Sequence, residues 1–321
     1  MEGIVIQTKK RKSDEANDHI KHNQPYKKIK FTSPLSDKTD DENNNNNNEF
    51  NAGPIGFTWD SQNYSCSYDA LFTILFNIWS ETPINFHARL ARRNTFIAKL
   101  EEQFQNIKNK ICTPEAARNS IRPLIHNYNS NNFPWGRIGV NMVNLSDLFF
   151  QNNRTVAFKN SKCTACTFEK SDMIKSYLFK QIYQFEGTTT QKWFTFITSD
   201  NPSPEICNNC NQNLMSYTNF SKVPPVIALD IYAQKTSISH KLTFKIWDDV
   251  KVLKLAGIIY LGDGHFTARI IDQNKNVWWH DGMKTYNRCE PEENLKNINA
   301  QKLKFLDRKK ACLAIYSACT K

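Results

Sequence analysis

A cysteine, a histidine and an aspartate occupy positions that can supply thiol chemistry. Cys66 opens an apolar stretch that ends at Trp79, and His265 and Asp281 follow about two hundred residues later. A thiol must lose its proton to act as a nucleophile, and the start of a helix beside an imidazole is where proteins lower a thiol pKa. The three residues predict a cysteine hydrolase with Cys66 as nucleophile, His265 as general base and Asp281 as the carboxylate that orients the base.

A hairpin between the last two residues would bring them together. Gln273–Lys275 has the composition of a turn between two strands. In the resulting register Asp281 lies opposite Thr267, which shares a sheet face with His265 because side chains alternate. Diagonal neighbours are roughly 7–8 Å apart at the backbone, so the carboxylate can reach the imidazole. The same register turns His280 away, and a slip of one residue would reverse this assignment.

Each member of the set also has a plainer interpretation. A single cysteine at a helix start is usually a small buried hydrophobic residue, and a lone histidine in a strand is usually structural. Only the combination of nucleophile, base and orienting carboxylate favours catalysis.

Two Cys-x-x-Cys pairs form a second chemical feature. Four thiolates at this spacing predict a tetrahedral zinc site, and such a site leaves no open coordination position, so its role is structural. The pairs are forty residues apart, which predicts that the metal joins the ends of an inserted hairpin. Free buried thiols, or a remnant that has lost its metal, are the alternative. The cysteines are Cys163, Cys166, Cys207 and Cys210. The expected strands of the hairpin draw on Tyr177, Phe179, Ile182, Phe185, Trp193, Phe194 and Phe196.

Composition separates a tail from a folded domain. Residues 1–52 contain the run Asn43–Asn48 and few large apolar side chains, which predicts disorder. The tail carries nine Lys and Arg against nine Asp and Glu, so the net charge of +11 belongs to residues 53–321. The basic clusters at 9–12 and 27–30 are either a two-part nuclear import signal or part of a solvated linker.

The chain has 40% hydrophobic residues but no apolar run of the roughly 18 residues that span a membrane. The first residues also lack the pattern of a secretion signal. We therefore expect an intracellular protein, nuclear or cytoplasmic or both, in which the thiols are reduced.

Hydrophobic periodicity predicts an α+β fold. Residues 66–79 are apolar on nearly every side, which indicates an enclosed helix, and residues 88–122 follow helical spacing. The C-terminal third favours a sheet, since β-branched and aromatic residues are frequent there. The expected strands are 223–232, 250–261, 265–272, 276–281 and 311–317.

The order of these motifs resembles the ubiquitin-specific proteases over residues 54–318. The most specific parts are Gly264–Ala268 and the four cysteines. The resemblance implies a papain-like cysteine protease fold over 53–321, with a thumb, zinc-bearing fingers at about 150–222 and an antiparallel palm sheet. It implies cleavage after the C-terminal Gly-Gly of ubiquitin or a relative, with Cys66, His265 and Asp281 matching the family triad. We expect the chain to be a monomer.

Two positions depart from the family pattern. Ser61 stands where the family usually has an asparagine that stabilises the oxyanion, so Gln62 or Asn63 becomes the candidate donor. Loss of one such donor costs roughly 10²–10³ in rate. Asp69 stands where the family generally has asparagine; its charge favours the helix start but opposes a nearby thiolate. A similar Cys-x-x-Asp arrangement occurs in the SUMO-directed branch of the family, which leaves ubiquitin and SUMO both open.

Three functions are compatible with these patterns. The first is a thiol isopeptidase for ubiquitin or SUMO, and the second is an inactive relative that binds a modifier. The basic domain favours acidic partners, and SUMO surfaces are more acidic than that of ubiquitin. The third is a nucleic-acid-binding zinc protein, which is disfavoured because no RNA or DNA motif is visible.

Overall fold

The computed structural model describes residues 53–83, 87, 94–180, 189–232 and 236–318. Residues 48–321 form one compact unit. The expected tail at 1–52, with its basic clusters, lies outside the described residues. Among the residues that are described, no helix is long and apolar enough to cross a lipid bilayer.

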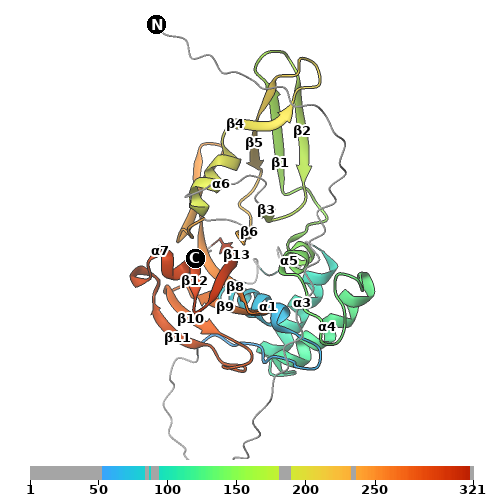
Figure 1. The fold of residues 1–321 in the computed structure, drawn as a ribbon, viewed down its shortest axis with the longest axis vertical. Helices are drawn as coiled ribbons and strands as arrows, with labels where there is room; N and C mark the ends of the chain where they lie inside the picture. Colours follow the sequence, from blue (N-terminus) through green and yellow to red (C-terminus); the bar gives the residue numbers. More distant parts are fainter. Residues whose placement is uncertain (1–52, 84–86, 88–93, 181–188, 233–235, 319–321) are drawn as a thin grey trace, which may run out of the picture. The chain divides into compact units, whose positions relative to one another are not determined.

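One central helix organises the fold. Helix α1 (Cys66–Ser80) is buried at every residue except Ser80, as its continuous apolar sequence predicts. It packs against strands of the larger sheet on one side and against three helices on the other (Figure 1). These helices are α3 (Thr95–Lys108), α4 (Pro114–Tyr128) and α5 (Met142–Phe150).

The helical segment predicted at 88–122 forms two helices in its described part. Helix α3 ends at Lys108, and α4 restarts with Thr113 as its N-cap and Pro114 at its first position. A threonine side chain at the N-cap accepts a backbone N–H, and proline suits the first turn because its missing N–H would have no partner there. Residues 88–93 lie outside the described part.

The larger sheet forms the other layer and confirms the strands predicted in the C-terminal third. Its strand order is β11-β10-β9-β8-β13-β6-β3, with β12 paired to β13 and β7 paired to β8. Neighbouring strands are antiparallel except β3 and β6. The strands are β3 (Leu178–Lys180), β6 (Val226–Asp230), β7 (Lys241–Ile246), β8 (Asp249–Gly262), β9 (His265–Ile271), β10 (Asn276–His280), β11 (Glu290–Asn294), β12 (Phe305–Leu306) and β13 (Lys309–Ser317), with short helices η1 (Leu295–Asn297) and α7 (Ala300–Lys304) between β11 and β12.

Two tight turns place the ends of β9. Gly262 pairs with His265, so β8 and β9 are joined by Asp263 and Gly264, both with positive φ. Such two-residue turns match the twist of antiparallel strands, and this one makes His265 the first residue of β9. At the other end of β9 the predicted register between β9 and β10 is confirmed, because His280 pairs with Ala268.

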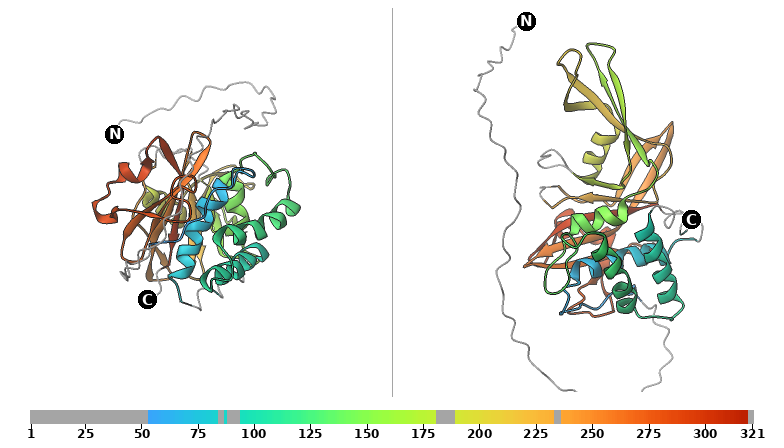
Figure 2. Two further views of the ribbon diagram at one scale, coloured as in Figure 1. Left: turned by 90° about the horizontal axis from the view of Figure 1, so that it is seen from below. Right: turned by 90° about the vertical axis from the view of Figure 1, so that its right-hand side faces the viewer.

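A smaller sheet extends beyond the larger one, away from α1 (Figure 2). Its order is β2-β1-β5-β4. Its strands are β1 (Ala157–Cys163), β2 (Glu169–Ile174), β4 (Asn201–Ile206) and β5 (Asn213–Phe220), and helix α6 (Thr190–Thr198) precedes β4.

The prediction for the aromatic residues of this region was wrong in its described part. Trp193, Phe194 and Phe196 lie in α6, and Phe179 lies in β3 of the larger sheet. Trp193 and Phe194 are buried in the main core, together with Ala157 and Phe220 of the smaller sheet, whereas the cysteine end of that sheet has a small core around Leu214. The larger core therefore takes the bulky side chains. Ile182 and Phe185 lie outside the described residues.

Candidate active site

His265 and Asp281 are hydrogen-bonded across β9 and the end of β10. Nε2 of His265 lies 2.8 Å from Oδ1 of Asp281, and the Met283 backbone N–H donates to the same oxygen at 3.0 Å. Burial is the largest single effect and acts to raise the pKa of Asp281, but the hydrogen bond and charge of His265, together with the Met283 N–H, hold the pKa below its usual value. The carboxylate is thus ionised at neutral pH, and it engages one imidazole nitrogen, which leaves Nδ1 for a nucleophile.

Cys66 is the first residue of α1, and its sulfur faces the strand that carries His265. The Phe266 backbone N–H points at the sulfur and lowers the thiol pKa, but burial is the larger effect and, with the charge of Asp69, raises the pKa to about 11. The residue is only 7% exposed. At neutral pH Cys66 is therefore a neutral thiol, and its activation requires a base such as the imidazole of the residue before Phe266.

His280 does not join this group, as the register predicts. It is buried, and its Nε2 lies 3.2 Å from the Phe57 backbone nitrogen and 3.1 Å from the Tyr286 carbonyl oxygen. Burial lowers the pKa of His280 to about 4. A Cβ at Gly56 would lie 2.2 Å from the His280 ring, so only glycine allows this close approach. His280 thus holds the segment that leads into α1.

The two amides named as oxyanion donors differ in their surroundings. The Asn63 side-chain amide donates to Oδ2 of Asp60 at 3.1 Å, and its carbonyl accepts from the Gly136 backbone N–H at 3.3 Å. Gln62 is exposed, and in its side chain only the carbonyl oxygen has a partner among the described residues, Arg137 at 3.4 Å. Gln62 is therefore the amide whose NH₂ group is available. The backbone N–H of Cys66 is a further donor, because the first N–H groups of a helix have no partner within the helix.

The first turn of α1, which begins with Cys66, takes part in a buried ion pair that the sequence analysis did not predict. Nη1 of Arg118, from α4, is 2.6 Å from Oδ1 of Asp69 in the first turn of α1, and both side chains are 2% exposed. The Ser65 hydroxyl donates to the other oxygen of Asp69 at 2.6 Å. The sequence carried a signal for this pair. Arg118 directly follows Ala117, a core position of an amphipathic helix, where a charged side chain needs a partner.

A second arginine of α4, Arg122, contacts the loop that precedes Cys66. Nη2 of Arg122 donates to the Asn63 carbonyl at 2.5 Å, and Nη1 lies 3.8 Å from Oδ2 of Asp60. The guanidinium stacks between the rings of Tyr68 and Trp135, 4.8 and 4.9 Å from their centroids. Both arginines of α4 therefore bind the chain that leads into Cys66.

The four predicted metal ligands meet at the tips of two hairpins of the smaller sheet. All four Sγ atoms lie within 4.8 Å of one another. Tetrahedral zinc with Zn–S of about 2.3 Å needs sulfurs about 3.8 Å apart, so the cluster fits such a site. The Ala165 backbone N–H lowers the pKa of Cys163, whereas the neighbouring thiols raise the pKa values of Cys166 and Cys210. Each Cys-x-x-Cys pair lies at a hairpin turn, so the site joins two hairpins and not the ends of one.

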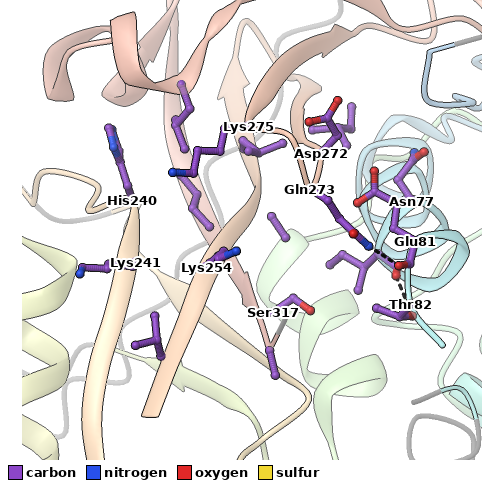
Figure 3. Close-up of a pocket in the computed structure, with 18 of the residues that line it drawn as sticks. Asn77, Glu81, Thr82, His240, Lys241, Lys254, Asp272, Gln273, Lys275 and Ser317 are labelled. Atoms are coloured by element: carbon purple, nitrogen blue, oxygen red, sulfur yellow. Dashed lines mark hydrogen bonds between the residues drawn. The ribbon is translucent and has the colours of Figure 1, made fainter. Parts of the chain in front are cut away.

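A cavity of about 340 Å³ lies at the opposite end of α1. Figure 3 shows Asn77, Glu81 and Thr82 of the helix end on one side of the cavity and His240, Lys241 and Lys254 on the other. Burial and the charge of Asp272 raise the pKa of Glu81 to about 7. None of the predicted catalytic residues lines this cavity, so it is separate from the candidate site.

Comparisons with known proteins find similar solved structures but no similar sequences. No family model matches the chain, and no curated protein matches its sequence. A structure of the SAGA DUB module (Ubp8, Sgf11, Sus1 and Sgf73) bound to monoubiquitin matches with a TM-score of 0.51 and 11% identity, over 83% of this chain and 69% of that chain. The module bound to ubiquitin aldehyde matches with a TM-score of 0.50 and 11% identity, over 83% and 70% of the two chains.

The catalytic unit of Pan2 from Neurospora crassa, with protease and nuclease domains, matches with a TM-score of 0.55 and 13% identity, over 83% of this chain and 57% of that chain. The α+β fold is that of a ubiquitin-specific protease catalytic domain, and its four-cysteine cluster is consistent with a structural zinc site in the fingers. At these identities the likeness concerns the fold alone.

Proposed function

We propose that this chain is a cysteine isopeptidase that removes ubiquitin or a ubiquitin-like modifier from proteins. One arrangement carries the proposal: His265 is hydrogen-bonded to Asp281 at 2.8 Å, and the next residue, Phe266, directs its backbone N–H at the Cys66 sulfur. The fold match to structures that contain ubiquitin supports the substrate class.

The chemistry follows from these positions. Nδ1 of His265 takes the proton of Cys66, and the sulfur attacks the carbonyl carbon of the isopeptide bond. The negative charge on the carbonyl oxygen is stabilised by the Cys66 backbone N–H and the side-chain amide of Gln62. The carbon–nitrogen bond then breaks, and His265 gives its proton to the leaving amine. Water hydrolyses the thioester with His265 again as base, while Asp281 holds the ring in position.

The modifier is proposed to be ubiquitin, with SUMO as the alternative. The two ubiquitin-containing matches favour ubiquitin, whereas the net charge of +11 favours a more acidic partner. Ubiquitin and SUMO bearing a C-terminal electrophile separate these cases. We expect a covalent adduct with ubiquitin at Cys66, mapped by peptide mass spectrometry, and no adduct with Cys66→Ala. Cys112→Ala is the matched control and should label normally. Labelling by SUMO alone would reverse the choice, and labelling by neither would reject the proposal.

A second candidate is a modifier-binding protein without turnover. The neutral, buried thiol of Cys66, with a pKa raised to about 11, favours it. It predicts that ubiquitin binds the wild-type protein and Cys66→Ala equally while no isopeptide is cleaved. Any cleavage that depends on Cys66 excludes this candidate.

The four cysteines are proposed to hold one structural zinc ion. The chemistry of the site, four thiolates on two hairpin tips, closes the coordination sphere, so the metal would join the hairpins and take no part in catalysis. The monomeric state and the nuclear or cytoplasmic location stay predictions from the sequence.

A further inference from the structure

Of the two arginines that contact the loop leading into Cys66, Arg118 binds both of its ends. Besides its ion pair with Asp69, Nη1 of Arg118 donates to the Thr58 carbonyl at 2.5 Å and to the Ser65 hydroxyl at 3.2 Å. The same hydroxyl accepts the Asp60 backbone N–H at 2.7 Å. The partners of Arg118 thus lie at both ends of the loop Thr58–Ser65 and in the first helical turn.

The ion pair between Arg118 and Asp69 also affects the electrostatic environment of the Cys66 sulfur. Asp69 is three residues after Cys66 on α1, and residues at this spacing are neighbours on a helix. Its charge disfavours the thiolate. The titratable and charged groups around these two residues are His265 on β9, with its partner Asp281, and Asp60, Arg118 and Arg122 around Asp69. Of these, Arg118 is the cation in direct contact with Asp69.

We propose that Arg118 is a positioning residue of the thiol site: it fixes the Thr58–Ser65 loop against α1 and neutralises Asp69, so that the Cys66 thiolate forms without an unscreened carboxylate beside it. The inference deepens the proposed function, because it concerns the nucleophile of that reaction. It makes the buried acid at position 69 compatible with thiol chemistry.

The test measures the reactivity of the thiol without any modifier. The rate at which iodoacetamide alkylates Cys66 is followed from about pH 6 to 10.5 by peptide mass spectrometry on the full chain. In Asp69→Asn the opposing charge is gone, so the pH profile should move to lower pH by about 0.5 unit or more. In Arg118→Met the cation is gone, so the profile should move to higher pH. In the double variant both charges are absent, and the profile should return close to that of the wild type.

If Arg118 had a purely structural role, the pH profiles of Asp69→Asn and Arg118→Met would not shift in opposite directions. Thermal melting and near-ultraviolet circular dichroism show which variants fold, and Lys99→Met, which removes the surface ion pair with Glu102, is the control that should leave the profile unchanged. If Arg118→Met does not fold, Asp69→Asn and Arg118→Lys still decide the question. Shifts of both single variants in one direction, or a profile unmoved in Asp69→Asn, would overturn the proposal.

Arg118→Lys separates charge from positioning. The ammonium keeps the positive charge, but it is a point charge without the planar fork of a guanidinium. We expect an alkylation profile close to the wild type and a reaction with the ubiquitin electrophile at least about tenfold slower. Equal probe rates for Arg118→Lys and wild type would contradict the positioning role. If the wild type reacts with no modifier probe, the proposed function fails, whereas the alkylation profiles still test the ion pair.

Discussion

Ile74 of α1 lies directly over Gly257 of β8, where a Cβ on the glycine would be 2.6 Å from Cγ2 of Ile74. The absence of a side chain at this position lets the central helix approach the sheet. The spacing between α1, which begins with Cys66, and the sheet that carries His265 therefore depends on a glycine of β8, the strand just before His265.

We expect Gly257→Ala to destabilise the protein by about 1–3 kcal/mol, because the added methyl group overpacks the helix–sheet contact. Chemical denaturation measures the change. Shortening the opposing side chain, in Gly257→Ala with Ile74→Val, should recover part of the loss. Gly139→Ala is the matched control, since its Cβ would meet nothing within 4 Å, and an equal loss in both glycine variants would contradict the close approach.

Asp281→Asn should reduce hydrolysis by about 10²–10⁴-fold while the fold is retained, because an amide cannot stabilise the imidazolium that forms on His265. Single-turnover kinetics with a ubiquitin substrate measure the effect. Asp263→Asn, in the turn before His265, changes a nearby carboxylate and should stay close to wild type. A rate for Asp281→Asn within threefold of wild type would show that the observed hydrogen bond has no role in the reaction.

His280 should make stability depend on pH. Its pKa falls from about 6.5 in the unfolded chain to about 4 in the folded protein, so the folded state binds fewer protons between these values. The stabilisation is present above pH 6.5 and is lost as the pH falls towards 4, by at most about 3 kcal/mol.

Melting temperatures across this window, compared between wild type and His280→Asn, measure the contribution. The variant should melt lower at pH 7 but lose less stability on acidification. His240→Asn removes an exposed histidine and should follow the wild type. Parallel pH curves for wild type and His280→Asn would contradict a buried neutral imidazole.

Zinc should bind at one equivalent per chain and stabilise the smaller sheet. Cys207→Ser removes the fully buried ligand, and we expect loss of the metal and faster hydrogen exchange in β1 and β5. Cys289→Ser, at a buried cysteine outside the cluster, should keep its zinc. Full zinc content in Cys207→Ser, measured by atomic emission, would show that the cluster is not the metal site.

Local patterns predicted much of the sheet and the central helix. The β9–β10 register followed from one three-residue turn and the alternation of side chains, and it correctly separated Asp281 from His280. The aromatic residues of α6 were misassigned because hydrophobic character alone does not reveal which core a side chain enters. Arg118 and Arg122 were missed because their meaning depends on the loop that α4 covers, a contact between residues some sixty positions apart.

The most direct test of the account is hydrolysis of ubiquitin bearing a fluorogenic C-terminal amide, measured from about pH 6 to 9 for wild type, Cys66→Ala and His265→Ala. The account predicts turnover by the wild type that both substitutions reduce to background, with Cys112→Ala unchanged. Undiminished turnover in Cys66→Ala, or no turnover by the wild type at any pH in this range, would contradict it.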